Sequence, residues 1–430
     1  MEHNPVIPLF IALAVIIIAA RIAGTTARRM KQPRVLGELL VGVLLGPTLL
    51  DMLHWSVFEH DPVLLEETIH ELAEIGVLLL MFKVGLEVHI KQLLEVGVVA
   101  AIAGVIGALL PVAMTMPLVM LAGEAWQPAL FTGVALAATS VSISAQVLLE
   151  LGVLQTKEGN ALLATALVDD VVAILLISLT IAITGTQGSV QVSELVNIVL
   201  KMTVYLVVAS LIAWFILPRI TYWMHTHPAN AESYGIPAVA LAMAFAFGWS
   251  AEIFGGVAAI TGAFIAGVGL SRNSRPIKNE IELAVNNIAY AFVVPIFFVS
   301  VGLKTDLSRF PLSALPFTIG LLLVAVSSKV IGCGLGAKLG GFNNFESLRV
   351  GVCMISRGEV GLIIAALGIT SGVYQTSDPL FAALFMVILL TTVLTPVLVR
   401  WVFKLPNQND ESDNQSQTSP QQKPEYSIEV

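Results

Sequence analysis

Two adjacent acidic residues stand in the middle of a long apolar stretch. Asp169 and Asp170 belong to the segment ALLATALVDDVVAILLISL, in which no other residue is charged. If this segment is a membrane-spanning helix, a rise of about 1.5 Å per residue puts both carboxyl groups about 15 Å deep, near the centre of a bilayer. A carboxylate at that depth costs about 2.5–3.5 kcal/mol to insert, so the pair predicts a functional site.

The chemistry open to such a carboxyl group follows from its loss of water. Desolvation favours the neutral acid, whereas a nearby cation favours the carboxylate. A buried aspartate can therefore hold either a proton or a hard monovalent cation, which is the minimum requirement for exchanging one ion for the other. The alternative is a packing pair in which Asp169 and Asp170 bond to hydroxyl groups of neighbouring helices.

A positive charge lies inside another apolar segment, LLLVAVSSKVIGCGLGAKLGG. We expect Lys329 to pair with one aspartate when no cation is bound and to lose its proton as the cation arrives. The alternative is a lysine whose long side chain reaches the inner headgroups.

Two further apolar segments carry an interruption at their centre, TSVS at 139–142 and SRGE at 356–359. Paired interruptions in the two halves of a chain indicate an inverted-repeat transporter with a site near the membrane midplane. Thr139 and Ser140 can offer the oxygen ligands that hard cations require.

The charged residues of the second interruption have a different expected role. Arg357 and Glu359 flank Gly358, where a broken helix would leave backbone groups without partners. We expect both side chains to support these backbone ends rather than to ligate the ion directly.

The elements that position these residues must be membrane helices. The chain is 56% hydrophobic and 12% charged, with a mean hydropathy of +0.87, whereas soluble domains contain about 25% charged residues. The sequence therefore predicts an all-α polytopic membrane protein with about 13 transmembrane helices in two inverted repeats. The predicted spans are 6–24, 35–52, 68–88, 93–121, 127–150, 160–184, 194–217, 234–251, 253–271, 280–302, 312–336, 346–371 and 378–403.

The distribution of basic residues predicts the orientation of these spans. Five basic residues lie at the end of the first span and in the loop after it, namely Arg21, Arg28, Arg29, Lys31 and Arg34, whereas the loops 53–67, 122–126, 185–193 and 372–377 contain neither Lys nor Arg. The positive-inside rule then puts the N-terminus outside and the C-terminus in the cytoplasm, with one exception in the loop that contains Lys304 and Arg309. Because no basic residue precedes the first apolar run, we interpret that run as a spanning helix and not as a signal peptide.

Other features exclude several classes of function. A net charge of −8 without a basic stripe argues against a nucleic-acid partner. Cys333 and Cys353 lie in apolar segments and are expected to be small buried residues, not a disulfide or a metal pair. We predict no cofactor. The polar residues 405–430 are expected to form a disordered cytoplasmic tail.

At this point the sequence resembles a known family, the bacterial sodium/proton antiporters of the monovalent cation:proton antiporter-2 family. The resemblance covers nearly all of residues 1–403. The motifs that show the resemblance are RVLGELLVGVLLGPTLL at 34–50, ATS at the first interruption, LVDDVVA at 167–173, GAFIAGVGLS at 262–271, PIFFVSVGLKTDL at 295–307, Lys329 and SRGEVGL at 356–362.

The resemblance implies a homodimer in which a core moves against a panel in an elevator-like cycle. The transmembrane antiporter domain would be 1–403, and the two broken helices would cross beside the aspartates. The core would comprise about 93–184 and 312–403, the panel about 1–92 and 234–302, and a linker helix 194–217.

The resemblance also assigns roles to single residues. Asp170 resembles the obligatory carrier of Na⁺ and H⁺, and Asp169 resembles the partner of Lys329. An Asp-Asp pair is typical of electrogenic, sodium-selective members, whereas related potassium members have Gln-Asp and a nucleotide-binding domain. Lys83 departs from the family pattern, in which an apolar residue is usual.

The sequence thus predicts a secondary transporter of the bacterial inner membrane, embedded in lipid, that exchanges Na⁺, and also Li⁺, for H⁺ and serves pH homeostasis. K⁺/H⁺ exchange is the main alternative, and symport of an organic solute with Na⁺ is another. An enzyme is not expected, because intramembrane aspartyl proteases place their two aspartates on separate helices and no HExxH motif is present.

Overall fold

The computed structural model describes residues 6–55, 57–58, 62–88, 95–184, 192–226, 235–304, 310–370, 373–374 and 378–404. In these ranges the regular secondary structure is entirely helical, which confirms the predicted all-α fold. The tail predicted to be disordered, 405–430, lies outside the described residues.

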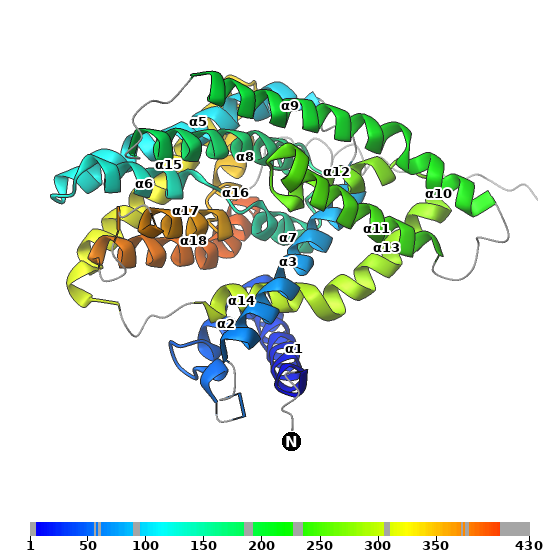
Figure 1. Ribbon diagram of the computed structural model, residues 1–430, viewed down its shortest axis with the longest axis horizontal. Coiled ribbons are helices and arrows are strands. Elements are labelled where there is room, and N and C mark those ends of the chain that lie inside the picture. Colours follow the sequence, from blue (N-terminus) through cyan, green and yellow to red (C-terminus); the bar gives the residue numbers. More distant parts are fainter. Residues whose placement is uncertain are drawn as a thin grey trace, which may run out of the picture.

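Figure 1 shows the helices in chain order. They are α1 (Val6–Arg29), α2 (Arg34–Leu45), η1 (Met52–His54), α3 (Pro62–Glu87), α5 (Gly97–Leu121), α6 (Trp126–Ala137), α7 (Val141–Leu151), α8 (Lys157–Thr184), α9 (Val192–Phe215), α10 (Leu217–Thr226), α11 (Gly235–Ser250), η3 (Ala251–Gly255), α12 (Ala259–Leu270), α13 (Arg275–Ile288), η4 (Ala289–Val293), α14 (Val294–Leu303), η5 (Leu312–Ala314), α15 (Leu315–Leu339), α16 (Asn344–Cys353), α17 (Glu359–Thr370) and α18 (Pro379–Phe403).

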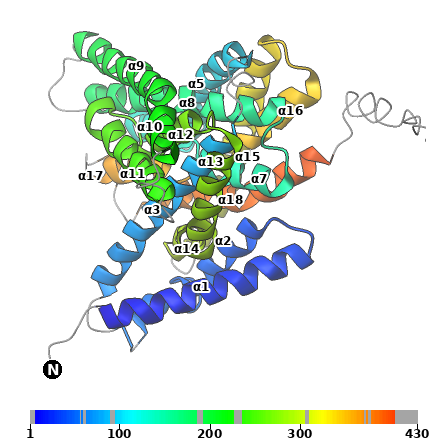
Figure 2. The same ribbon diagram turned by 90° about the vertical axis from the view of Figure 1, so that its right-hand side faces the viewer.

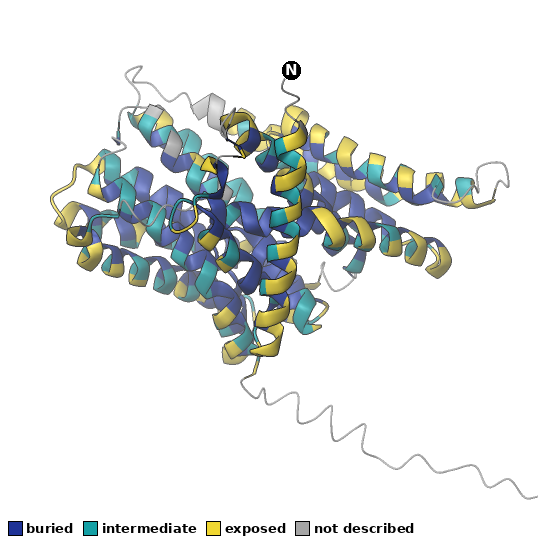
Figure 3. Ribbon diagram, turned by 90° about the horizontal axis from the view of Figure 1, so that it is seen from below, coloured by how far each residue is buried: buried dark blue, intermediate teal, exposed yellow. Residues whose placement is uncertain are grey.

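Nine helical stretches of the described chain are long and apolar enough to cross a membrane. The other predicted spans correspond to α2, α3, α12 and the broken pair α16/α17. Exposed apolar side chains cover the outer faces of the helices, among them Phe10 and Ile22 of α1, and Figure 3 shows exposed residues along these faces and buried ones inside. The chain is a multi-pass membrane protein, and the count of about 13 crossings stays a prediction.

Two predicted helix boundaries were wrong for identifiable reasons. The span predicted at 35–52 ends at Leu45, because Gly46 is extended and precedes Pro47, which disfavours a helical conformation at the residue before it. The span predicted to begin at 253 begins at Ala259, because the chain turns at Gly256, whose φ of +65° suits glycine.

The helices pack in two groups. The first comprises α5–α8 and α15–α18, and the second comprises α1–α3 and α9–α14. In Figure 1, α5, α6, α15, α17 and α18 lie on the left and α10–α13 on the right. Figure 2 also separates α5, α15 and α16 from α9–α13, with α1 running along the bottom. The groups meet mainly where α8 contacts α9, where α7 contacts α2 and α3, and where α18 contacts α2.

Close backbone contact joins two long helices of the first group, α5 and α15. A Cβ atom added to Gly336 would lie 2.4 Å from Cα of Ala103, and one added to Gly340 would lie 2.7 Å from Cα of Val99. Small residues at such contacts let membrane helices approach closely. The glycines therefore set the position of α15, the helix that carries Lys329.

The second group contains two π-helical turns, η3 and η4. The turn η4 lies between α13 and α14 within one uninterrupted helix from Arg275 to Leu303. A π turn inserts one residue into an α-helix. In this turn the carbonyl oxygen of Tyr290 accepts a hydrogen bond of 2.7 Å from Arg21 of α1.

The α5–α15 contact predicts a difference between two glycine-to-alanine variants of the same helix. Gly336→Ala should lower the melting temperature of the purified protein, because overpacking against a backbone costs about 1–3 kcal/mol. Gly320→Ala is the matched control, since a Cβ added there has no atom within 4 Å in the described structure. Equal melting temperatures for the two variants in detergent would contradict this account of the packing.

Candidate ion-binding site

The two predicted broken helices are present, and their breaks lie against each other. Residues 138–140 separate α6 from α7, and residues 354–358 separate α16 from α17. The backbone N–H of Ser140 donates to the carbonyl oxygen of Ser356 (3.0 Å), and the Ser356 hydroxyl donates to the carbonyl oxygen of Ser140 (2.5 Å). Each break thus supplies hydrogen-bond partners that the other lacks, as buried backbone at membrane depth requires.

Gly358 is needed at this crossing for reasons of space. A Cβ atom added to Gly358 would lie 2.6 Å from Cβ and 2.7 Å from Oγ of Ser140. Real Cβ atoms do not approach other atoms so closely, so a larger residue would force the two breaks apart.

Arg357 is fully buried beside the crossing. Its guanidinium group donates to the carbonyl oxygens of Met354 (3.2 Å) and Ala325 (3.2 Å), and its own carbonyl oxygen accepts from the Thr392 hydroxyl. The Met354 carbonyl group belongs to the end of α16, where no helical partner exists, whereas Ala325 lies within α15 and the bond to it joins the break to that helix. Glu359 is the first residue of α17, and its side chain lies outside the part that the structure describes.

Lys329 and Asp169 form an ion pair between α15 and α8. The distance from Lys329 Nζ to Asp169 Oδ1 is 2.7 Å, and the two side chains are 0% and 1% exposed. The attraction between such charges has to offset the desolvation of both ions, which requires close geometry. The second carboxylate oxygen of Asp169 has no hydrogen-bond partner among the described residues.

Asp170 faces a different environment from its neighbour, because adjacent helical residues point about 100° apart. It is half-buried, and the Thr261 hydroxyl of α12 donates to its Oδ2 (3.4 Å). It lines a small pocket together with Met81 of α3, Val141 of α7 and Phe264 of α12. The pocket therefore lies between the two helix groups.

Thr139 and Ser140 are buried in the first break, directly before the pocket residue Val141. The Thr139 hydroxyl has no hydrogen-bond partner within the described ranges, whereas the Ser140 hydroxyl is 3.2 Å from that of Ser142. The break thus brings oxygen atoms next to the wall of the Asp170 pocket, and their role as ion ligands stays a prediction.

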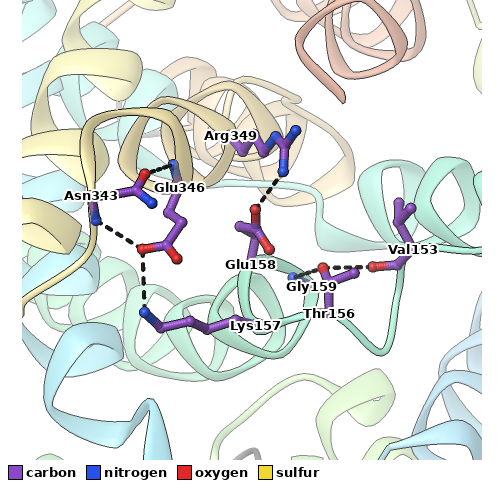
Figure 4. A network of polar contacts seen from close by, with 8 residues as sticks. All are labelled: Val153, Thr156, Lys157, Glu158, Gly159, Asn343, Glu346 and Arg349. Carbon is purple, nitrogen blue, oxygen red and sulfur yellow. Dashed lines mark hydrogen bonds and ion pairs between the residues drawn. The ribbon is translucent and has the colours of Figure 1, made fainter. Parts of the chain in front are cut away.

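A polar network that was not predicted from the sequence anchors the start of α8. Arg349 of α16 donates to Glu158 (2.8 Å), and both side chains are buried. Lys157 pairs with Glu346 (3.2 Å), which also forms a capping box with Asn343 at the start of α16 (Figure 4). The Asn-x-x-Glu spacing is a recognised signal of a helix start and would have predicted this end of α16.

A second missed network joins the two helix groups. Tyr290 donates to Gln146 of α7 (2.8 Å), Gln146 donates to Glu150 (3.1 Å), and the backbone N–H of Arg34 donates to Glu150 (2.6 Å). Lys83 joins this network, because its Nζ is 3.3 Å from the Tyr290 hydroxyl and 3.3 Å from Glu87. The unusual lysine is thus paired at the contact between the groups.

Comparison with known proteins defines the fold and the family of this chain. The sodium proton antiporter MjNhaP1 of Methanocaldococcus jannaschii has the same fold, with a TM-score of 0.64 over 94% of this chain and 99% of that one at 18% identity. The chain belongs to the family described as "Sodium/hydrogen exchanger, transmembrane", whose profile matches residues 13–405.

Relatives within the family are similar over nearly their whole length. The Na(+)/H(+)-K(+) antiporter GerN of Bacillus cereus is 35% identical over 92% of this chain and 96% of its own. A Na(+)/H(+) antiporter of Enterococcus hirae is 35% identical over 91% of this chain and 97% of its own.

The contact between the two breaks predicts that a substitution at Ser140 can relieve the steric clash caused by a larger residue at position 358. Gly358→Ala should lower the melting temperature, because its methyl group meets the Ser140 side chain. Adding Ser140→Gly removes both contacting atoms and should restore part of the loss. If the melting temperature of the double variant is no higher than the sum of the two single-variant losses predicts, the two breaks are not in direct contact at this point.

Proposed function

We propose that this protein exchanges Na⁺ for H⁺ across a bacterial inner membrane and that Asp170 carries both ions in turn. The observation that supports this most directly is that the two aspartate side chains have different surroundings. Asp169 is neutralised by Lys329 at 2.7 Å, whereas Asp170 lines a pocket between the helix groups. The relatives named as Na⁺/H⁺ antiporters support Na⁺ as the cation.

The competition between ions follows from the pocket. A carboxylate in an apolar pocket is stabilised either by a proton or by a cation with oxygen ligands. Thr261 already contacts Asp170, and Thr139 and Ser140 lie beside Val141 in the adjoining break. These oxygen atoms are the proposed ligands of Na⁺, and Li⁺ has the same ligand preference.

Lys329 makes the proposed exchange electrogenic. When Na⁺ enters, its charge weakens the hold of Asp169 on the Lys329 ammonium group, and the lysine releases its proton. Together with the proton that leaves Asp170, more than one H⁺ then leaves for each Na⁺ bound. The net movement of charge would couple exchange to the membrane potential.

The two helix groups suit an elevator-like cycle. Asp170 belongs to the first group, while Met81, Thr261 and Phe264 of its pocket belong to the second. Sliding the first group along the second would carry the carboxylate from one side of the barrier to the other. In this proposal the first group is the core and the second group, with the linker helix, forms the panel of a homodimer, with the N-terminus outside and the C-terminus in the cytoplasm.

K⁺/H⁺ exchange is the second candidate, because the relative GerN is named an antiporter of both Na⁺ and K⁺. The two functions differ only in which cation displaces the proton from Asp170. Proton flux in proteoliposomes, driven in turn by Na⁺, Li⁺ and K⁺ at clamped membrane potential, separates them. If K⁺ drives proton flux and Na⁺ and Li⁺ do not, the proposal of Na⁺/H⁺ exchange is wrong and K⁺/H⁺ exchange takes its place.

Asp170→Asn should abolish cation-driven proton flux in these vesicles while the purified protein keeps its monodisperse elution profile, because an amide cannot exchange a proton for Na⁺. Asp51→Asn is the matched control, since Asp51 contacts His54 at the surface and should leave the flux unchanged. Wild-type exchange by Asp170→Asn would refute the assignment of the carrier.

Lys329→Gln should reduce the charge moved per Na⁺, measured as the ratio of membrane current to ion flux. It should also lower the melting temperature, because leaving one partner of a buried pair alone costs about 3–5 kcal/mol. The double variant Lys329→Gln/Asp169→Asn removes both charges and should recover much of that stability. An unchanged ratio of current to flux in Lys329→Gln would show that the lysine takes no part in coupling.

A further inference from the structure

An apolar groove opens between the helix that carries the aspartates and the helix that links the two groups. It is formed by α8, α9 and α12 and has a volume of about 590 Å³, within the range of about 300–1,000 Å³ for ligand pockets. Its walls include Leu206, Leu211, Ile265 and Val268, and among its described lining residues Ser210 supplies the only hydroxyl group. Such a lining suits a hydrocarbon chain.

Two exposed arginines stand over aromatic residues of this groove. The Cζ atom of Arg272 is 3.8 Å from the ring centre of Trp214, and its Nη1 donates to the Trp214 carbonyl oxygen (2.8 Å). The Cζ atom of Arg219 is 5.8 Å from the ring centre of Phe215. Trp214 and Phe215 both line the groove. A guanidinium group has five donors and matches the geometry of phosphate oxygens.

The groove also adjoins the ion site. Leu167 and Phe264 line both the groove and the pocket that contains Asp170. These two side chains therefore form the wall between the carboxylate and the surrounding bilayer. A molecule bound in the groove would pack against Leu167 and Phe264 from the side opposite to Asp170.

We propose that the groove binds one acyl chain of an anionic phospholipid, whose phosphate is held by Arg272 and Arg219. The apolar lining selects the chain and the two positive charges select the headgroup. The lipid then supports Leu167 and Phe264 and keeps the Asp170 pocket closed toward the bilayer. In the proposed topology both arginines lie on the cytoplasmic side, where the membrane surface carries anionic lipid.

Trp214 offers a direct test, because a brominated acyl chain in the groove would quench its fluorescence. The other tryptophans of the chain, Trp55, Trp126, Trp223, Trp249 and Trp401, are exposed and can be changed to Phe with little effect on packing. The full chain with Trp214 alone is reconstituted in phosphatidylcholine vesicles that contain the same small fraction of brominated phosphatidylglycerol or of brominated phosphatidylcholine.

Brominated phosphatidylglycerol should quench Trp214 several-fold more than brominated phosphatidylcholine does. Arg219→Gln/Arg272→Gln should remove this preference, whereas the control Lys338→Gln/Lys404→Gln, which removes two exposed cations elsewhere, should keep it. Ser210→Phe, which fills the groove, should weaken quenching by both lipids.

Two results would overturn the proposal. Equal quenching by both lipids, insensitive to Ser210→Phe, would mean ordinary contact with bulk lipid. No quenching by either lipid would mean that another surface, such as a second copy of the chain, covers the groove. The measurement needs no ion transport, so its failure is independent of the proposed exchange.

Discussion

The site depends on one ion pair that is closed off from water. Lys329 and Asp169 are in contact at 2.7 Å with almost no exposed surface, and only such close geometry can offset the desolvation of both ions. The pair ties α8 to α15, whose own position is set by the glycine contacts with α5. It also cancels the charge of one of two adjacent aspartates. A single carboxylate, Asp170, is left facing the pocket between the groups.

The crossing of the broken helices follows from the same lack of water. Backbone groups freed at mid-membrane need partners, and here the break of α6/α7 and that of α16/α17 supply them to each other through Ser140 and Ser356. Arg357 supports the carbonyl end of α16 with a charge that is itself fully buried. The breaks, the ion pair and the anchored start of α8 therefore belong to one helix group. Asp170, which follows Asp169 in the chain, contacts the other group directly, through Thr261.

Much of this could be predicted from the sequence, because bilayer insertion leaves strong local signals. Apolar runs gave the helices, and the polar interruptions at 139–142 and 356–359 gave the breaks. Contacts between distant residues left no such signal. Lys329 and Asp169 are 160 positions apart. That Lys329 pairs with one of the two aspartates was expected from their buried charges, but the choice of Asp169 came only from the family resemblance. Thr261, 91 positions from Asp170, and Tyr290, 144 positions from Gln146, have no distinguishing sequence context and could be found only in the folded chain.

The π-helical turn at Ala289–Val293 fixes the helical phase between α13 and α14. One inserted residue rotates everything beyond it by about 100° around the helix axis. In α14 that rotation sets the face on which Gly302 meets α2, so closely that an added Cβ would lie 2.5 Å from the Leu39 carbonyl oxygen. An insertion or deletion elsewhere in α13 or α14 would turn this face away from α2. Loss of one residue from the turn itself would rotate α14 in the same way, so the length of this helix is tied to the faces that its two halves present to their neighbours.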